Sequence, residues 1–548
     1  MRSTFLVLSL CGALVAVGPN GVSRLRAHDH TRHQADQQRR ASLQLAARQA
    51  EPPPNATRAN CQLTVRLREA DGGRPLPGLL RITNLATQKA LTLAAEIHRE
   101  ANWYSVPAQL TIPVPRARLR LDAFHGIETE RATLELDLTD RERHEVELTL
   151  PRFYEPRARQ WWAGNTHLHL MKLSYVEAIR YLELVPRTDG LDVVFLSHLR
   201  RIPDERDYIS NQIVENSFTG GELQRLSQGG VTFGNGEEHR HNFGRGSEGY
   251  GHVMLLDLPH LIQPVSIGPG IMGSGDDGRP LQTGIREARA AGATVIWCHN
   301  TFGLEDIPNW MAGLLQAQNI FDGGVHGSYH DTFYRYLNLG MRIPFSTGTD
   351  WFIYDFSRVY VPLPSKPTVA DWLRELQAGR TFITNGTFLE LSVDGRSAGD
   401  TIALAQPATL QVEARGIGRN DFRGLELIHN GEIVQRQSSR GIAGHFESQA
   451  KWELPVGEPG WVALRIPLEA GRNEFDKPLF AHTSAVYVEV AGRKIFRREV
   501  AQDLVREMES SLAPIRSQGQ FRDDSQREGV LQVYREGISR LRQRLEAP

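Results

Sequence analysis

Cysteine is scarce in this 548-residue chain, which has three cysteines in all. Cys11 lies inside an apolar run near the N-terminus, which leaves Cys61 and Cys298. These two lie in different predicted domains and provide neither a disulfide framework nor the cysteine cluster of a structural zinc site. A metal ion in this protein would therefore have to be bound by histidine and carboxylate side chains.

The chain also lacks an excess of charge of either sign, because 63 Lys and Arg residues balance 64 Asp and Glu residues. This balance argues against nucleic acid as a partner. Long apolar runs are missing after residues 5–17, which follow Arg2 and precede Gly18. We interpret residues 1–20 as a secretory signal peptide, with an uncleaved anchor as the alternative. We therefore expect a secreted or periplasmic protein with no stable membrane span after signal cleavage.

Three common catalytic elements are missing as well. The one Gly-x-Ser-x-Gly of the chain, at residues 395–399, lies in a strand-rich segment and not at a strand-to-helix turn, so it is not the elbow of a serine nucleophile. The chain has no phosphate-binding P-loop. It also has no dinucleotide-binding Gly-x-Gly-x-x-Gly with the usual preceding strand and acidic partner. The chemistry has to be sought in other residues.

The chain is long enough for three or four domains. Residues 21–58 are polar and predict a linker. Residues 59–150 and 391–498 consist of alternating, strand-like segments, which predict an N-terminal and a C-terminal β-sandwich. Residues 160–390 alternate helical patterns with short apolar runs, which is typical of an α/β barrel or a doubly wound sheet. Residues 499–548 have amphipathic helical spacing and predict a helical hairpin.

His167 and His169 lie one residue apart at the end of an apolar segment of the middle domain. Side chains two positions apart on a strand point the same way, so both imidazoles could bind one ion. Other short apolar runs of this domain end in, or begin with, a histidine or carboxylate: His198, Glu237, Glu238, His252, His299 and Asp350. Residues just past the carboxyl ends of barrel strands converge on one face. The pattern therefore predicts a metal site.

These motifs resemble those of the polymerase-and-histidinol-phosphatase (PHP) superfamily, specifically the secreted CehA/McbA-like metallohydrolases. The resemblance covers about residues 160–400, in the segments 164–169, 190–198, 236–238, 251–252, 298–299, 348–350 and 376–386. It implies an α/β fold with a distorted (β/α)7 PHP-type barrel and divalent metals at the carboxyl-end face. The two β-sandwich domains and the helical hairpin would flank this barrel.

Carried over residue by residue, the resemblance implies two divalent metal ions, Zn²⁺ before Mn²⁺ or Fe. The implied ligands of one ion are His167, His169, Glu238 and Asp350. The implied ligands of the other ion are Glu238, His252 and His299. Glu238 would bridge the two ions, and it is preferred to Glu237 because the family's glutamate lies two residues after a glycine.

The sequence departs from the superfamily's three-metal pattern at Tyr175, Ser197 and Phe352, where histidine or aspartate is usual. A third ion would have His198 as its only clear ligand, so we predict two ions, or one ion at low occupancy. His198 is then a catalytic candidate that contacts substrate or transfers a proton, and the alternative is a hydrogen bond to a metal ligand. Weaker candidates for substrate contact are His326, Tyr329 and His330, which we expect in a loop near the site. The alternative is that these residues only stabilise the loop through local hydrogen bonds.

The implied ligand set predicts a function. Two ions held in this way would activate a water molecule and polarise the scissile bond. We therefore expect an exported metal-dependent hydrolase that cleaves an ester, amide, carbamate or phosphoester bond. The scarcity of Lys and Arg clusters near the motifs tilts slightly against phosphate, and whether the substrate is a small molecule or a polymer stays open. The alternative is a secreted metal- or polysaccharide-binding protein with a catalytically degenerate barrel.

Overall fold

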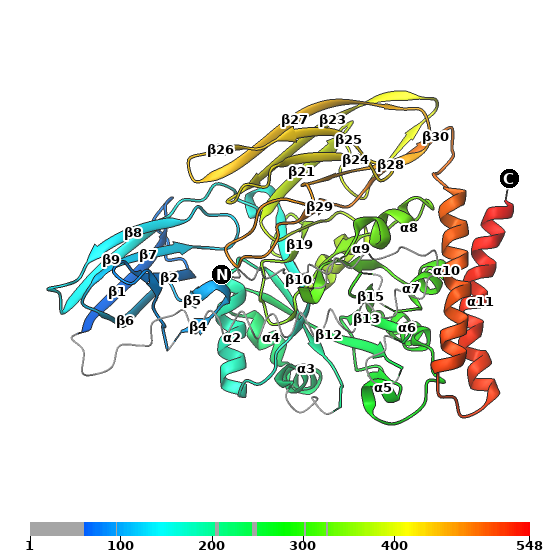
Figure 1. Ribbon diagram of the computed structural model, residues 1–548, viewed down its shortest axis with the longest axis horizontal. Helices are drawn as coiled ribbons and strands as arrows, with labels where there is room; N and C mark the ends of the chain where they lie inside the picture. Colours follow the sequence, from blue (N-terminus) through cyan, green and yellow to red (C-terminus); the bar gives the residue numbers. More distant parts are fainter. Residues whose placement is uncertain are drawn as a thin grey trace, which may run out of the picture.

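The computed structural model describes residues 60–94, 96–202, 208–243, 249–300, 303–324 and 327–547. The predicted signal peptide, the predicted linker and His326 lie outside these residues. Within them the protein is a mixed α/β structure with four sheets, the largest of which has 17 strands and is curled (Figure 1). No helix in this part of the chain is long and apolar enough to cross a membrane.

The N-terminal region consists of two sheets around one hydrophobic core. The first sheet contains β1 (Asn60–Glu69), β6 (Gln109–Pro115) and β9 (Arg143–Leu150). The second contains β2 (Gly78–Asn84), β3 (Lys89–Ala90), β4 (Ile97–His98), β5 (Tyr104–Val106), β7 (Arg118–Phe124) and β8 (Ala132–Asp137). Alternate residues of β1 are fully buried, such as Leu63, Val65 and Leu67, because successive strand side chains point to opposite faces. A short helical segment, η2 (Glu100–Asn102), joins β4 to β5.

The first part of the largest sheet consists of seven strands, on or near which the predicted metal ligands lie. In pairing order they are β10 (Trp161–His169), β11 (Val193–His198), β12 (Thr232–His241), β13 (Gly251–Leu256), β15 (Thr294–Trp297), β16 (Ala317–Asn319) and β17 (Phe345–Ser346). β10, β11 and β12 are parallel, as are β15, β16 and β17, whereas β13 is antiparallel to both of its neighbours. β14 (Ser266–Ile267) pairs with β12. β18 (Asp350–Trp351) follows β17 and pairs with β10, so the sheet curls back toward its first strand.

Helices pack around this curled sheet. They are α2 (Tyr175–Thr188), α3 (Ile209–Gly220), α4 (Glu222–Ser227), α5 (Pro269–Met272), α6 (Leu281–Ala290), α7 (Asp306–Met311), α8 (Arg335–Leu337) and α9 (Val369–Gln377). α2 begins at a capping box, in which the Ser174 hydroxyl accepts from the Glu177 amide and the Glu177 carboxylate accepts from Ser174. The shorter helical turns are η3 (Arg157–Arg159), η5 (Asp322–Gly324) and η6 (His330–Tyr334). Trp372 of α9 packs against Gly164, where an added Cβ would lie 2.3 Å from the indole.

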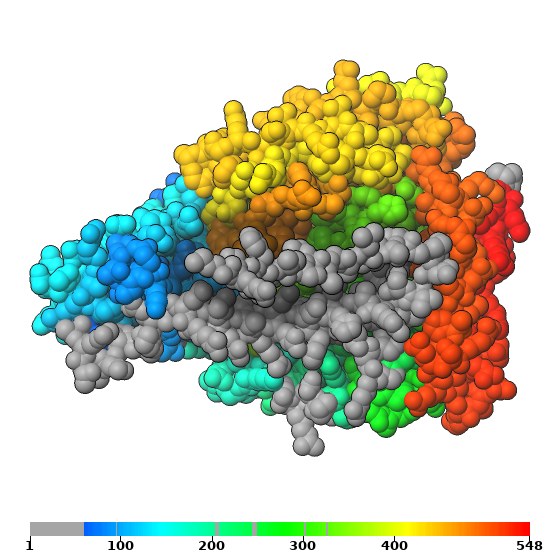
Figure 2. Space-filling model, in the orientation of Figure 1, coloured from blue at the N-terminus to red at the C-terminus, as the bar shows by residue number. Residues whose placement is uncertain are grey.

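The C-terminal strands lie over the curled sheet in Figure 1. The same large sheet continues through β19 (Arg358–Pro362), β20 (Phe382–Thr384), β22 (Thr401–Leu404), β24 (Gly424–His429), β25 (Glu432–Ser438), β28 (Gly460–Arg465), β29 (Ala481–Thr483) and β30 (Val486–Val490). A separate sheet contains β21 (Thr387–Val393), β23 (Ala408–Gly418), β26 (Arg440–Ile442) and β27 (His445–Val456). Two long helices, α10 (Arg498–Gln518) and α11 (Asp524–Glu546), pack on each other and on α7, and they form one end of the molecule (Figure 2).

Candidate metal centre

Six buried side chains of the largest sheet and its loops converge on one region, and they are the six metal ligands that the resemblance implies. The first group that they form contains His167, His169, Glu238 and Asp350. The second group contains Glu238, His252 and His299. In each group, one ligand atom from every residue lies within 4.8 Å of the others. None of the six residues exposes more than 2% of its surface.

The strand register explains why these residues meet. Glu238 of β12 pairs with Met254 of β13, and His252 lies two residues before Met254, so Glu238 and His252 share a face of the sheet. His299 follows the neighbouring strand β15 and therefore lies beside His252. On the other side, Asp350 pairs with Leu168, the residue between the two histidines of β10.

The first group surrounds a single point. The Nε2 atoms of His167 and His169 are 2.9 Å apart. Glu238 Oε2 lies 3.2 Å from His169 Nε2 and 3.9 Å from His167 Nε2. Asp350 Oδ1 lies 3.5 Å and 3.7 Å from the same two nitrogens. Ligand atoms that share one tetrahedral Zn²⁺ ion lie about 3.3 Å apart, so these separations suit one ion.

The second group uses the other oxygen of Glu238. Glu238 Oε1 lies 3.3 Å from His252 Nδ1 and 3.5 Å from His299 Nε2. Arg240 Nη1 lies 3.5 Å from the same oxygen. The two oxygens of one carboxylate thus face different sets of imidazoles, which is the arrangement of a bridging ligand.

Hydrogen bonds fix which nitrogens of the first pair face the centre. His169 Nδ1 lies 3.0 Å from the Ser197 carbonyl oxygen, and because a carbonyl can only accept, Nδ1 donates. His167 Nδ1 lies 2.8 Å from Asp322 Oδ2, which also accepts a hydrogen bond from the side-chain amide of Asn319. The Nε2 atoms of both rings are therefore available as ligands. Partners of this kind orient metal-binding histidines and raise their basicity, so the donor set fits a divalent cation.

Charges in the centre favour the ionised form of its carboxylate. Burial raises the pKa of Glu238, but Arg240 and the neighbouring imidazoles outweigh burial and hold that pKa well below its usual range. Burial lowers the pKa of His167, but the charges of Asp322 and Asp350 outweigh it and raise that pKa well above 6.5. Burial raises the pKa of the Cys298 thiol to about 12. Cys298 lies near His167 and His299, but as a neutral thiol it is the poorer ligand.

Two of the six residues have strained backbones. His299 has φ 53° and Asp350 has φ 59°, values in the left-handed region that favours glycine. Strain of this kind costs about 1–3 kcal/mol per residue and is concentrated at functional sites. A close approach adds a second constraint, because a Cβ at Gly348 would lie 2.6 Å from His167 Cβ.

The segment after Asp350 is held by residues outside the centre. The Arg99 guanidinium, from the N-terminal region, donates to the Ile353 carbonyl oxygen at 2.7 Å. Arg99 also forms a buried ion pair with Asp189 at 2.8 Å. The Tyr181 hydroxyl accepts from the Ile353 amide at 2.7 Å. The N-terminal sheets thus contribute to the position of the loop that carries Asp350.

Asp322 is the residue of this centre that the sequence analysis missed. It contacts His167 and lies 3.9 Å from His299 Nδ1. It follows β16 by three residues, just as His299 follows β15 by two residues. β16, however, is only Ala-Gln-Asn, and the apolar run that marks the other strands is missing.

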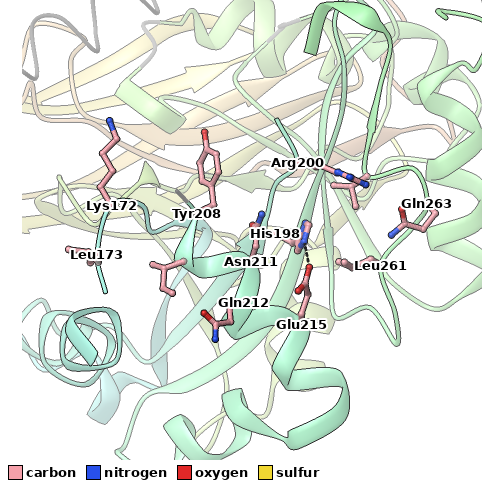
Figure 3. A pocket seen from close by; sticks show the side chains of 12 residues that line it. Lys172, Leu173, His198, Arg200, Tyr208, Asn211, Gln212, Glu215, Leu261 and Gln263 are labelled. Atoms are coloured by element: carbon pink, nitrogen blue, oxygen red, sulfur yellow. Dashed lines mark hydrogen bonds and ion pairs between the residues drawn. The ribbon is translucent and has the colours of Figure 1, made fainter. Parts of the chain in front are cut away.

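His198 lies apart from the two groups. Its Nε2 is 3.0 Å from Glu215 Oε1, and its ring lines a cavity of about 590 Å³ (Figure 3). Of the weaker candidates, Tyr329 is buried against Phe321 and His482, and the His330 side chain is 65% exposed.

The three positions that depart from the superfamily pattern have different surroundings. Tyr175 is exposed at the start of α2, and the Phe352 ring packs on Tyr181. The Ser197 hydroxyl has no hydrogen-bond partner among the described residues. The Phe352 side chain has no atom that could bind a metal ion.

Known proteins add no information on this centre. No protein-family model, no curated protein and no solved structure matches the chain. The resemblance to the PHP superfamily therefore stays a prediction.

Proposed function

We propose that this protein is a metal-dependent hydrolase of the PHP type, similar to the CehA/McbA-like enzymes. The observation that carries the proposal is the position of Glu238, whose two oxygens face two sets of imidazoles at 3.2–3.5 Å. His167, His169 and Asp350 would complete the site of one divalent ion, and His252 and His299 the site of the other. Zn²⁺ suits this set of imidazoles and carboxylates, and Mn²⁺ or Fe are alternatives.

The fold proposal follows from the strand pairings. We propose that β10, β11, β12, β13, β15, β16 and β17, closed through β18, form a distorted (β/α)7 barrel. Residues 59–150 and 391–498 would be β-sandwich domains on its flanks, and the α10–α11 pair would be a C-terminal hairpin. The candidate centre would then lie at the carboxyl-end face, where barrel enzymes place their catalytic residues.

The residues around the centre would have distinct roles. Bound divalent ions would supply an activated water and polarise the scissile bond. Asp322 and the Ser197 carbonyl would orient His167 and His169. The near-complete burial of the six side chains would strengthen their charge interactions. His198 would exchange a proton or contact the substrate from the cavity. The substrate bond would be an ester, amide, carbamate or phosphoester, and the signal-like N-terminus suggests export.

Metal analysis combined with substrate screening tests this proposal. Purified wild-type protein should contain bound Zn, Mn or Fe and should hydrolyse chromogenic esters or phosphoesters. His167→Ala should lose metal and activity, whereas His144→Ala, the same change in the N-terminal β9, should retain both. His198→Ala should keep its metal but turn over more slowly.

Two results would contradict the proposal. Wild-type protein that stays free of Zn, Mn and Fe after metal loading would exclude a metal-dependent enzyme. Full metal content without hydrolysis of any substrate in the screen would favour the alternative, a secreted metal- or polysaccharide-binding protein with a degenerate barrel.

A further inference from the structure

A cavity of about 590 Å³ lies at the ends of β10 and β11 (Figure 3). Its walls come from the segment after β10, the segment after β11, the first half of α3 and the loop between β13 and β14. The residues that matter for its chemistry are Lys172, His198, Arg200, Gln212, Glu215 and Gln263.

The cavity is next to the first group of candidate ligands. Lys172 on its wall follows His169 by three residues. The carbonyl of Ser197, the residue before His198, accepts from His169 Nδ1. The Tyr208 ring also lines the cavity, and its centroid lies 6.1 Å from that of His169. Tyr208 is therefore next to both the cavity and the His169 imidazole.

Among the described residues that line the cavity, positive charges outnumber negative charges. Lys172 and Arg200 supply two positive charges, and they lie on opposite sides of the His198–Glu215 pair in the view of Figure 3. Glu215 supplies one negative charge, but its Oε1 already accepts from His198 Nε2 at 3.0 Å. Lys172 has no ion pair among the described residues, and its φ of 56° is in the left-handed region. Lys172 is exposed, so its ammonium group is accessible to a ligand that enters the cavity.

Other polar groups in the cavity are also available to a ligand. His198 is 5% exposed, and its Nδ1 has no hydrogen-bond partner among the described residues. Leu173 and Leu261 add apolar wall. The lining thus suits an organic group that carries one carboxylate or phosphoryl charge on a short apolar stem.

We propose that this cavity binds the part of the substrate that carries a negative charge, with Lys172 as the partner of that charge. This assignment rests on the hydrolase function proposed above, and it narrows the expected substrates to molecules that carry a negative charge. The enzyme would act on the ester or amide of an anionic molecule, with the scissile bond toward His169 and the anion toward Lys172.

A pair of chromogenic esters tests the charge preference. Mono-nitrophenyl glutarate carries a carboxylate at the end of its acyl chain, and nitrophenyl pentanoate is the neutral analogue of similar length. Lys172→Gln should raise KM for the glutarate ester about tenfold, the size expected for one lost charged hydrogen bond, with little change in kcat. KM for the neutral ester should change less than about twofold. Lys89→Gln, on a strand of the N-terminal sheets, is the matched control and should change neither.

Calorimetry tests the cavity without any turnover. Glutarate and inorganic phosphate are titrated separately into wild-type protein and Lys172→Gln protein of equal metal content. Weaker binding of glutarate alone to the variant identifies a carboxylate ligand, and weaker binding of phosphate alone identifies a phosphoryl ligand.

The two experiments separate failure of the cavity assignment from failure of the hydrolase. Equal changes in KM for both esters, or equal affinity of both proteins for glutarate and for phosphate, would overturn the cavity assignment. Absence of binding by either probe would do the same. A clear calorimetric difference without hydrolysis of any ester, amide, carbamate or phosphoester would support the cavity and contradict the enzyme.

Discussion

The two faces of strand β12 carry similar residues in different surroundings. One face presents Glu238 to the imidazoles of the candidate centre. The other face presents Glu237, His239 and His241, which are just as completely buried. There, Glu237 Oε1 pairs with His239 Nδ1 at 3.0 Å, and Oε2 accepts from the Ile262 amide at 2.7 Å.

Both ring nitrogens of His241, on this second face, also have hydrogen-bond partners. Its Nε2 donates to Asp277 Oδ1 at 2.8 Å, and its Nδ1 accepts from the Tyr250 amide at 3.0 Å. Its ring stacks on that of Tyr250 with a centroid separation of 3.7 Å. Buried histidines and glutamates therefore do not make a site by themselves. The candidate centre differs because several nitrogen and carboxylate ligand atoms point at a common space.

The largest effect should separate Glu238 from Glu237. Glu238→Gln should remove both bound ions, because one carboxylate oxygen serves each group. Glu237→Gln should keep both ions and lose about 1–3 kcal/mol of unfolding free energy, the usual size for a disturbed buried hydrogen bond. Elemental analysis and urea unfolding of the two variants measure these effects. Two full-occupancy ions in Glu238→Gln would disprove the bridging role.

The next effect should come from Asp322, which contacts His167 but is not proposed as a ligand. Asp322→Asn should weaken metal affinity about 10–100-fold, since partners that orient ligand histidines have effects of this size. Competition with a chromogenic chelator measures the affinity. Asp277→Asn, which changes the equivalent partner of His241 on the other face of β12, is the matched control and should leave the affinity unchanged. A similar loss in both variants would show a general effect on folding.

Two glycines, one beside each face of β12 or its partners, allow the two sets of buried histidines to be compared through a smaller effect. A Cβ at Gly348 would lie 2.6 Å from His167 Cβ, and a Cβ at Gly284 would lie 2.1 Å from His239 Nε2. Each alanine substitution should cost about 1–3 kcal/mol of stability through overpacking. Gly348→Ala should also weaken metal binding because His167 is displaced, whereas Gly284→Ala should not. Thermal unfolding with and without added Zn²⁺ distinguishes the two: the shift that the metal produces should shrink only in Gly348→Ala.

Much of the centre was predictable because barrel-like strands place chemistry at their ends. The His-x-His spacing indicated a pair on one strand, and β10 carries that pair. The preference for Glu238 over Glu237 depended on the resemblance, and strand alternation agrees with it, because only one of two adjacent strand residues can point to the centre.

Other features could not be read from the sequence for physical reasons. Asp322 follows a three-residue polar strand, so no apolar run marks its position. The chain from His330 to Tyr334 is a π-helical turn, whereas we expected a loop there, and a contact of these residues with substrate stays a prediction. The ion pair between Arg99 and Asp189 joins residues 90 positions apart, and no local pattern reports such a contact.

The smallest effect concerns the pH dependence of stability, and it comes from His241 on the second face of β12. Burial lowers the pKa of His241 below 6.5, and Asp277 opposes this shift only in part. The unfolded chain therefore binds a proton more readily than the folded protein, so the stability that His241 contributes is complete above pH 6.5 and declines as the pH falls below it. The slope should reach at most about 1.4 kcal/mol per pH unit.

Urea unfolding of wild-type and His241→Gln protein at a series of pH values measures this contribution. The difference in unfolding free energy between the two proteins should be largest above pH 6.5 and should shrink toward pH 5, because other titrating groups are common to both. Parallel curves would mean that His241 keeps an ordinary pKa. The hydrogen bond from His241 to Asp277 would then offset the effect of burial on this pKa completely. The second face of β12 would in that case resemble the candidate centre more closely than its geometry indicates.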